Sequence, residues 1–319
     1  MRVLLLFLLI PVWNSIVFAQ TGKEVRDKAI NAAARILDMG SVTFDVHVKA
    51  ELGTITKQHF DGLVSVQKLG KQKRLSYEVG KWGAPGRPGE IAERFAAASG
   101  SPLPVIDSFD GKYTYLYRPG SRLLRKQPSV EFQCPKPFGS VFPEGWVSVA
   151  GLYTVNVGFL LSQKGVEERA PTAPDSPWVF FHEYPDTNAF KRIEIKVDPA
   201  SGFHVVEIKT LGGLGDSKVE FEWAEKEGKW FPRKARIADY RGYKVEWEIQ
   251  TIDFRASAIS EPFSLTDKEM PFGTRVVALS NEENGRRNSK VHYVGGADGK
   301  LEHQLRERAI VKLRRDLKK

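Results

Sequence analysis

The chain has little cysteine: Cys134 is the only one among its 319 residues. No internal disulfide can therefore form, and the stability of the protein has to come from a packed core. Neither Gln133 nor Pro135 offers the electropositive setting that activates a thiol, so we expect a plain buried or partly buried side chain.

Motifs of the common enzyme classes are also missing. The sequence has no Gly-x-Ser-x-Gly elbow, no His-Glu-x-x-His pair, no P-loop, and no dinucleotide fingerprint between a strand and a helix. The glycine-rich run 211–215 lies between two predicted strands, so it indicates a hairpin loop rather than a phosphate site. We therefore predict neither enzymatic activity nor a cofactor.

Histidine and acidic residues do not form a recognisable cluster. His47 and His59 could approach each other across a hairpin, near Asp45 and Asp61, and such a set could hold a metal. His47 lies on the polar face of its predicted strand, however, which favours an ordinary exposed histidine and no metal site.

Acidic pairs on predicted strands are the other candidates for catalytic chemistry. Glu246 and Glu248 share the solvent face of one strand with Lys244. Cross-strand salt pairing explains this arrangement better than acid–base catalysis.

After residue 19 the chain has no apolar run long enough to cross a membrane. Before it, Arg2 precedes the apolar run 3–10, and Ala19 closes a site of the kind that signal peptidase reads. We predict a cleavable signal peptide, with cleavage after Ala19, and a soluble protein exported to the periplasm or another part of the cell envelope. The alternative, an uncleaved anchor, is disfavoured by Pro11 and Asn14 inside the run.

The net charge of +9 is unevenly distributed. Residues 301–319 contain seven Lys or Arg against three Asp or Glu, and the body from 20 to 300 carries only +4. This balance argues against nucleic-acid binding. The basic tail suits contact with an anionic membrane surface or an acidic protein partner, and it equally suits a solvated end.

The sequence does contain one helical pattern and many alternating ones. Thr21 to Glu24 fits a capping box, and apolar residues follow at helical spacing up to Leu37. From Ser41 onward the apolar period changes to two, first over 41–52 and then repeatedly as far as residue 250. Strands joined by short turns predict one meandering antiparallel sheet.

Two segments interrupt this meander. Residues 89–99 indicate a short helix between Pro/Gly-rich flanks. The segment 128–177 contains seven prolines and an apolar run, 155–161, that suits a short helix in or across the mouth of the sheet. Beyond residue 279 the pattern resembles a polar linker followed by the basic tail.

Aromatic residues dominate the phase of the strands that we expect to face inward. Tyr113, Tyr115 and Tyr117 recur with period two after the Asp110–Gly111 turn, so their rings share one face. These side chains either fill a core covered by helices or line a cavity for an apolar ligand. The candidate lining comprises Phe44, Val46, Tyr77, Tyr113, Tyr115, Tyr117, Phe221, Trp223 and Trp247.

The order of these elements resembles the periplasmic lipoprotein-carrier superfamily, with its LolA/LolB-like fold. The resemblance rests on the N-terminal helix, the long strand 41–52, the Asp-Gly-Lys opening of the tyrosine strand and the closing segments 262–265 and 270–277, and it covers about residues 21–279. It implies an α+β fold, a half-open and strongly curved antiparallel β-barrel with a few helices on or plugging its concave face. Members of the family carry or sense acylated proteins and lipids.

We therefore expect a signal peptide at 1–19, a single LolA-like β-barrel domain at 20–279 with a Pro-rich insertion around 128–177, and a linker and tail at 280–319. The predicted function is an exported envelope protein, most simply a monomer, that binds acyl chains, lipids or lipidated proteins. The alternative is a non-catalytic interaction or stress-sensing module whose barrel is filled by its own side chains.

Overall fold

The computed structural model describes most of the chain after residue 19. The described residues are 20–52, 58–78, 82–83, 104–119, 122–132, 134, 138–148, 156–173, 176–184, 191–213, 215–259, 261–266, 268, 270–271, 273–279 and 289–294. The predicted signal peptide, the predicted helix at 89–99 and the basic tail lie outside these residues.

The N-terminal helix α1 (Gly22–Leu37) begins at the predicted capping box. Thr21 N–H donates to Glu24 Oε2 at 3.0 Å, and Glu24 N–H donates to Thr21 Oγ1 at 3.3 Å. These two bonds satisfy backbone donors that the first turn would otherwise leave open. The helix buries one face, on which Val25, Ala29 and Ala33 lie.

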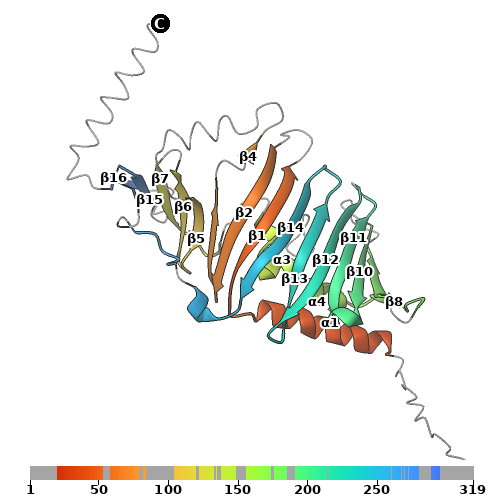
Figure 1. The fold of residues 1–319 in the computed structure, drawn as a ribbon. Coiled ribbons are helices and arrows are strands. Elements are labelled where there is room, and N and C mark those ends of the chain that lie inside the picture. Colours follow the sequence, from red (N-terminus) through yellow and green to blue (C-terminus); the bar gives the residue numbers. More distant parts are fainter. Residues whose placement is uncertain are drawn as a thin grey trace, which may run out of the picture.

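Almost everything else belongs to one large sheet of sixteen strands. Fifteen of them follow one another in the order β16-β15-β7-β6-β5-β3-β2-β1-β14-β13-β12-β11-β10-β9-β8, and β4 pairs with β2 beside this path. All neighbours are antiparallel except β15 and β7. Within the described residues the terminal strands β16 and β8 do not pair, so the curved sheet stays open (Figure 1). The predicted half-open antiparallel architecture is confirmed.

The long strands β1, β10, β11, β12 and β14 agree with the alternating patterns of the sequence, whereas the short strands β4, β8 and β9 were not predicted. The strands are β1 (Ser41–Leu52), β2 (Gln58–Leu69), β3 (Gln72–Tyr77), β4 (Trp82–Gly83), β5 (Val105–Phe109), β6 (Tyr113–Arg118), β7 (Leu123–Pro128), β8 (Glu167–Arg169), β9 (Trp178–Glu183), β10 (Arg192–Asp198), β11 (His204–Leu211), β12 (Ser217–Lys226), β13 (Lys229–Ala238), β14 (Lys244–Asp253), β15 (Arg275–Leu279) and β16 (Ser289–Tyr293).

The helices gather on one face of this sheet, which we call the inner face and which carries Phe44, Val46 and Val48. Besides α1 they are α3 (Pro143–Trp146) and α4 (Val157–Ser162), with the 3-10 turn η3 (Phe138–Ser140). Two further 3-10 turns, η4 (Pro199–Ser201) and η5 (Ala256–Ala258), follow the ends of β10 and β14. Figure 1 shows α1 along the lower ends of the strands, with α3 and α4 behind the sheet. Side chains from α1, η3, α3 and α4 join those of the inner face in one apolar core.

A second, smaller apolar cluster covers the opposite, outer face of β5, β6, β7 and β15. Its members are Ile106, Tyr115, Tyr117, Leu124, Leu265, Met270, Val276 and Val294. The segment 261–266 is fastened there by Ser108 Oγ, which donates to the carbonyl of Phe263. The sheet is therefore buried on both faces at this end.

Two expectations about the chain's organisation can be compared with these elements. The apolar run 155–161 does form a short helix, α4, packed against α1. The sheet, however, continues past the expected boundary at 279, because β16 pairs with β15. The alternation in 289–293 is only five residues long between two polar stretches, which is too short to stand out in the sequence. No helix in the described part of the chain is long and apolar enough to span a membrane.

Candidate functional site

The centre of the inner face is the first candidate site, because three of the predicted lining residues meet there. The Phe44 ring packs on Trp146 of α3 with centroids 5.8 Å apart, and the Tyr77 ring lies 4.8 Å from Phe138 of η3. Trp247 Nε1 donates to Ser140 Oγ at 3.1 Å. The sheet aromatics thus contact the segment 138–147, which we call the plug, rather than an open space.

Charged side chains hold the plug at its edge. Glu144 Oε1 of α3 lies 3.2 Å from Lys73 Nζ and 3.6 Å from Lys68 Nζ. Lys68 is almost fully buried and also donates to the carbonyl of Met39 at 2.7 Å. Because a buried ammonium needs such partners, the plug and the end of α1 are tied to the same lysine.

Three more of the predicted residues lie in or against the same core. Val46 and Phe221 are buried, and Trp223 is half-buried with its ring 5.9 Å from Phe221. Trp223 stacks on His204 at 4.2 Å and donates from Nε1 to the carbonyl of Val205 at 2.7 Å. Burial, aided by Arg35, lowers the pKa of His204 to about 4, so this histidine is a neutral stacking partner at pH 7.

The tyrosine strand β6 requires a correction. Ile106 pairs with Tyr117 and Ser108 with Tyr115, while the neighbouring Val105 pairs with Tyr77. Directly paired residues share a face, so Tyr115 and Tyr117 lie on the outer face, opposite Tyr77. The three tyrosines therefore belong with the outer cluster and do not line one cavity with the other six residues.

On the outer face these rings have polar as well as apolar partners. Tyr115 Oη donates to Asp110 Oδ2 at 2.7 Å, and Lys126 Nζ lies 4.3 Å from the Tyr113 ring centroid and 5.3 Å from that of Tyr115. Asp110 also accepts from the backbone N–H groups of Lys112 and Tyr113, which builds the predicted turn. The tyrosine strand is thus anchored by its own turn.

Sequence reasoning missed a buried polar group at the β5–β6 end of the inner face. The Asp107 carboxylate is fully buried, 2.7 Å from Arg118 Nη2, and it accepts from Tyr77 Oη at 3.1 Å. Burial raises the pKa of Asp107 and the Arg118 charge opposes that rise. The only sequence signal is one carboxylate in the apolar phase of a short strand, which by itself does not identify a partner.

The opposite end of the inner face contains a small apolar cavity of about 10 Å³ between α4 and strands β9 and β10. Leu160 and Leu161 line it from the helix, and Phe180, Ile193 and Ile195 line it from the sheet. Phe159 on the other side of α4 is 59% exposed.

The remaining candidates of the sequence are ordinary structural residues. His47 Nε2 lies 3.0 Å from Asp61 Oδ1, while His59 pairs with Glu51, four residues along β1. The two histidines therefore do not converge, and no group of three or more metal-ligating side chains does so in the described ranges. Burial raises the pKa of the half-buried Cys134 thiol, which keeps it protonated and unreactive.

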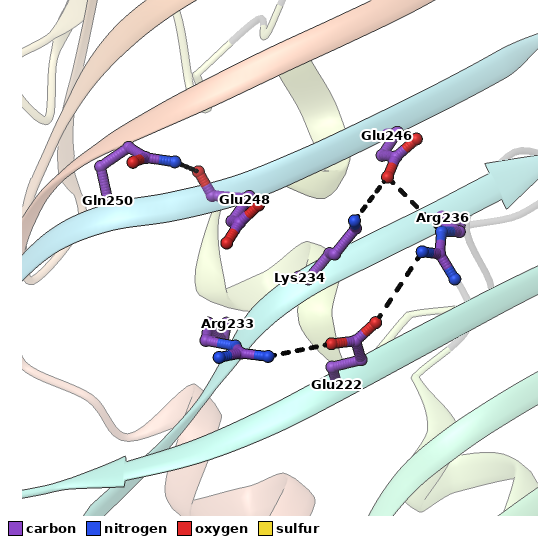
Figure 2. Close-up of polar contacts among 7 residues, drawn as sticks. All are labelled: Glu222, Arg233, Lys234, Arg236, Glu246, Glu248 and Gln250. Carbon is purple, nitrogen blue, oxygen red and sulfur yellow. Dashed lines mark hydrogen bonds and ion pairs between the residues drawn. The ribbon is translucent and has the colours of Figure 1, made fainter.

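The outer face of β12, β13 and β14 carries a network of charges (Figure 2). Glu246 Oε1 lies 2.7 Å from Lys234 Nζ and 3.5 Å from Arg236 Nε, and Glu222 pairs with Arg233 at 3.2 Å and with Arg236 at 4.0 Å. The predicted cross-strand pairing of Glu246 is confirmed. An open groove of about 400 Å³ lies beside this network, and three of its basic side chains already pair with its three glutamates: Lys218 with Glu220, Arg236 with Glu246 and Lys244 with Glu51.

No family model matches the chain, and no curated protein sequence matches it. Solved structures do resemble it in fold. One is a LolA superfamily protein from Nitrosomonas europaea, with a TM-score of 0.38 and 13% identity over 79% of this chain and 98% of the other. A putative outer membrane lipoprotein-sorting protein domain from Vibrio parahaemolyticus has a TM-score of 0.40 and 10% identity over 72% and 94%.

A protein of the DUF1329 family from Desulfovibrio piger gives a TM-score of 0.34 and 10% identity over 73% of this chain and 98% of the other. The likeness to all three is distant. It concerns the fold alone.

Proposed function

We propose that this protein is an exported, non-catalytic cell-envelope protein that binds an acyl chain, as a lipid or as part of a lipidated protein, at the inner face of its sheet. The observation that carries the proposal is an open sheet whose apolar inner face is covered by short helices. Helices α3 and α4 have four and six residues, so neither is stable by itself and both depend on packing.

Exchange of such a cover for an acyl chain is energetically reasonable. Each buried methylene contributes about 0.8 kcal/mol, so a long chain can replace the contacts of a short helix. Helix α4 is the better candidate for displacement, because it covers the cavity with Leu160 and Leu161, whereas α3 is tied to the sheet through Glu144.

A disulfide that fastens α4 to α1 tests this proposal. A Cβ on Gly158 would lie 3.6 Å from the Ala33 Cβ, which suits a disulfide, and the Asn156 side chain at 2.9 Å would have to shift slightly. We expect Ala33→Cys/Gly158→Cys, made in Cys134→Ser, to take up a fluorescent fatty acid when reduced and to lose uptake at least tenfold when oxidised. Each single cysteine variant serves as control and should not respond to oxidation.

The same measurement separates the alternative function. An interaction or stress-sensing module with a self-filled barrel is favoured by the close packing of Trp146, Phe138 and Trp247 in the centre of the inner face. That module would take up no fatty acid in either redox state, and mass spectrometry of an organic extract would find no lipid. Such a result would reject the carrier function.

A further inference from the structure

A row of four side chains crosses strands β9 to β12 at the end of the inner face that holds the small cavity. His182 pairs with Ile193, Ile193 pairs with Thr210, and Thr210 pairs with Ser217. Direct pairs in antiparallel strands point to the same side, and Ile193 belongs to the inner core. All four residues therefore share the inner face.

Three polar atoms of this row have no hydrogen-bond partner in the described part of the chain. They are His182 Nδ1, Thr210 Oγ1 and Ser217 Oγ. Thr210 is 2% exposed and Ser217 is 7% exposed, so neither hydroxyl is exposed to bulk solvent. Buried polar groups are normally paired, so these atoms are free to take hydrogen bonds from a ligand. Thr210 and Ser217 are direct neighbours, and His182 lies two strands from Thr210 with Ile193 between them.

The polar row borders an apolar site. His182 and Ile193 also line the cavity under α4, together with Leu160 and Phe180. The ring of His182 is positioned there by Tyr184, whose ring centroid lies 4.5 Å away. A ligand that reaches both regions must combine a hydrocarbon part with a hydrogen-bonding part.

We propose that Thr210, Ser217 and His182 bind the uncharged polar head of an acyl-bearing ligand, such as the ester and hydroxyl groups of a glycerol ester. This rests on the proposed function. The row contains no Lys, Arg, Asp or Glu, so a charged head would be desolvated without a counter-ion from the row.

The side chains of Thr210 and Ser217 are close enough to act on one head group. Directly opposite Cβ atoms in antiparallel strands are about 5 Å apart, so both hydroxyls can reach one ester or diol. A hydroxyl can donate to the ester carbonyl, and the unpaired nitrogen of His182 can bind a ligand hydroxyl. The acyl chain would then lie toward Leu160 and Phe180.

The test removes the two hydroxyls and compares two ligands of equal chain length. In the wild-type protein, 1-monopalmitoylglycerol should displace a bound fluorescent fatty acid more readily than palmitate does. In Thr210→Val/Ser217→Ala this preference should fall about fivefold for each hydroxyl, while palmitate binding stays unchanged. An N-palmitoylated peptide distinguishes a free lipid from a lipidated protein as the source of the head group. If the peptide displaces the probe more readily than palmitate to the same degree, the head group recognised is that of a lipidated protein.

The stability of the double variant towards denaturant is a second measurement. The matched control for the ligand preference is Thr114→Val. Thr114 is also buried on the inner face with an unpaired hydroxyl, but it lies in β6 at the other end of the sheet, so its removal should leave the preference intact. The double variant should unfold at the wild-type denaturant concentration or above it. An unchanged preference, or a loss of stability that reveals a structural hydrogen bond, would overturn this assignment alone. Failure of every acyl probe to bind would overturn the proposed function as well.

Discussion

At the scale of single residues, burial rather than side-chain type decides what a group does here. His204 is 6% exposed between Trp223 and Trp230, and its pKa is lowered to about 4. The folded state therefore binds a proton on this ring less readily than the unfolded chain, whose histidine has a pKa near 6.5. Stability from this group is complete above pH 6.5 and is lost as the pH falls through 4.

We predict that His204 makes the protein acid-sensitive. The unfolding free energy should fall by about 3 kcal/mol between pH 7 and pH 4 because of this residue alone. In His204→Phe that part of the pH dependence should disappear, as urea unfolding at the two pH values would measure. The control is His47→Gln, which removes an exposed histidine paired with Asp61 and should keep the wild-type slope. Equal slopes for wild type and His204→Phe would contradict the prediction.

At the scale of elements, neighbouring strands are joined on the outer face by ion pairs that converge on single carboxylates. Glu207 of β11 lies 2.8 Å from Lys196 of β10, 3.2 Å from Lys209 and 3.2 Å from Lys218 of β12. Burial raises the pKa of Glu207, but hydrogen bonds from these three lysines outweigh it and lower the pKa to about 2. The carboxylate thus ties together three strands that carry the polar row on their other face.

We predict that Glu207→Gln lowers the unfolding free energy by about 1 kcal/mol at pH 7, because three lysines lose their shared counter-ion. The difference from wild type should shrink as the pH falls from 4.5 toward 2, since protonation then removes the same charge in wild type. Urea unfolding of wild type and Glu207→Gln at pH 4.5 and at pH 2 measures this difference. Glu222→Gln, at a side chain 47% exposed, should change stability by less than half as much.

Sequence patterns predicted secondary-structure elements and turns better than they predicted which side chains of different strands come into contact. The capping box at Thr21, the Asp110–Gly111 turn and the short helix predicted around 155–161, which is observed at Val157–Ser162, are all present, because each depends on residues close together in the chain. The pairing of Asp107 with Arg118 and the row from His182 to Ser217 were not predictable, because each joins different strands. Such groups become neighbours only when the strand order and register are known.

At the scale of the whole molecule, one sheet supports two apolar clusters on opposite faces. The inner cluster extends over most strands and includes the helices, whereas the outer cluster covers only the end near β15 and β16. Val294, just after β16, is buried in the outer cluster. The proposed binding site and residues 289–294 therefore lie on different parts of the fold.

We predict that two truncations separate these parts. Ending the chain after Leu279 removes β16 and Val294, and the loss of buried apolar surface should lower the melting temperature by about 5 °C. Ending it after Val294 keeps both and should leave the melting temperature unchanged. Both proteins should still take up a fluorescent fatty acid, as measured by titration, because the inner face is intact. Loss of uptake in either one would place the site elsewhere.

Alternation and turn residues in the sequence predicted one meandering antiparallel sheet, and the resemblance to the lipoprotein-carrier superfamily implied that this sheet is half-open. The sequence by itself could not determine which face each strand presents, because a period of two fixes only the alternation within one strand. The face is set by register and by bulges, such as those at Asp45/Val46 and Glu222/Trp223. Tertiary structure alone therefore placed Tyr115 and Tyr117 on the outer face and Thr210 and Ser217 on the inner face. Only the pairing of a strand with its neighbours decides which of its two sets of alternating side chains lies on a given face of the sheet.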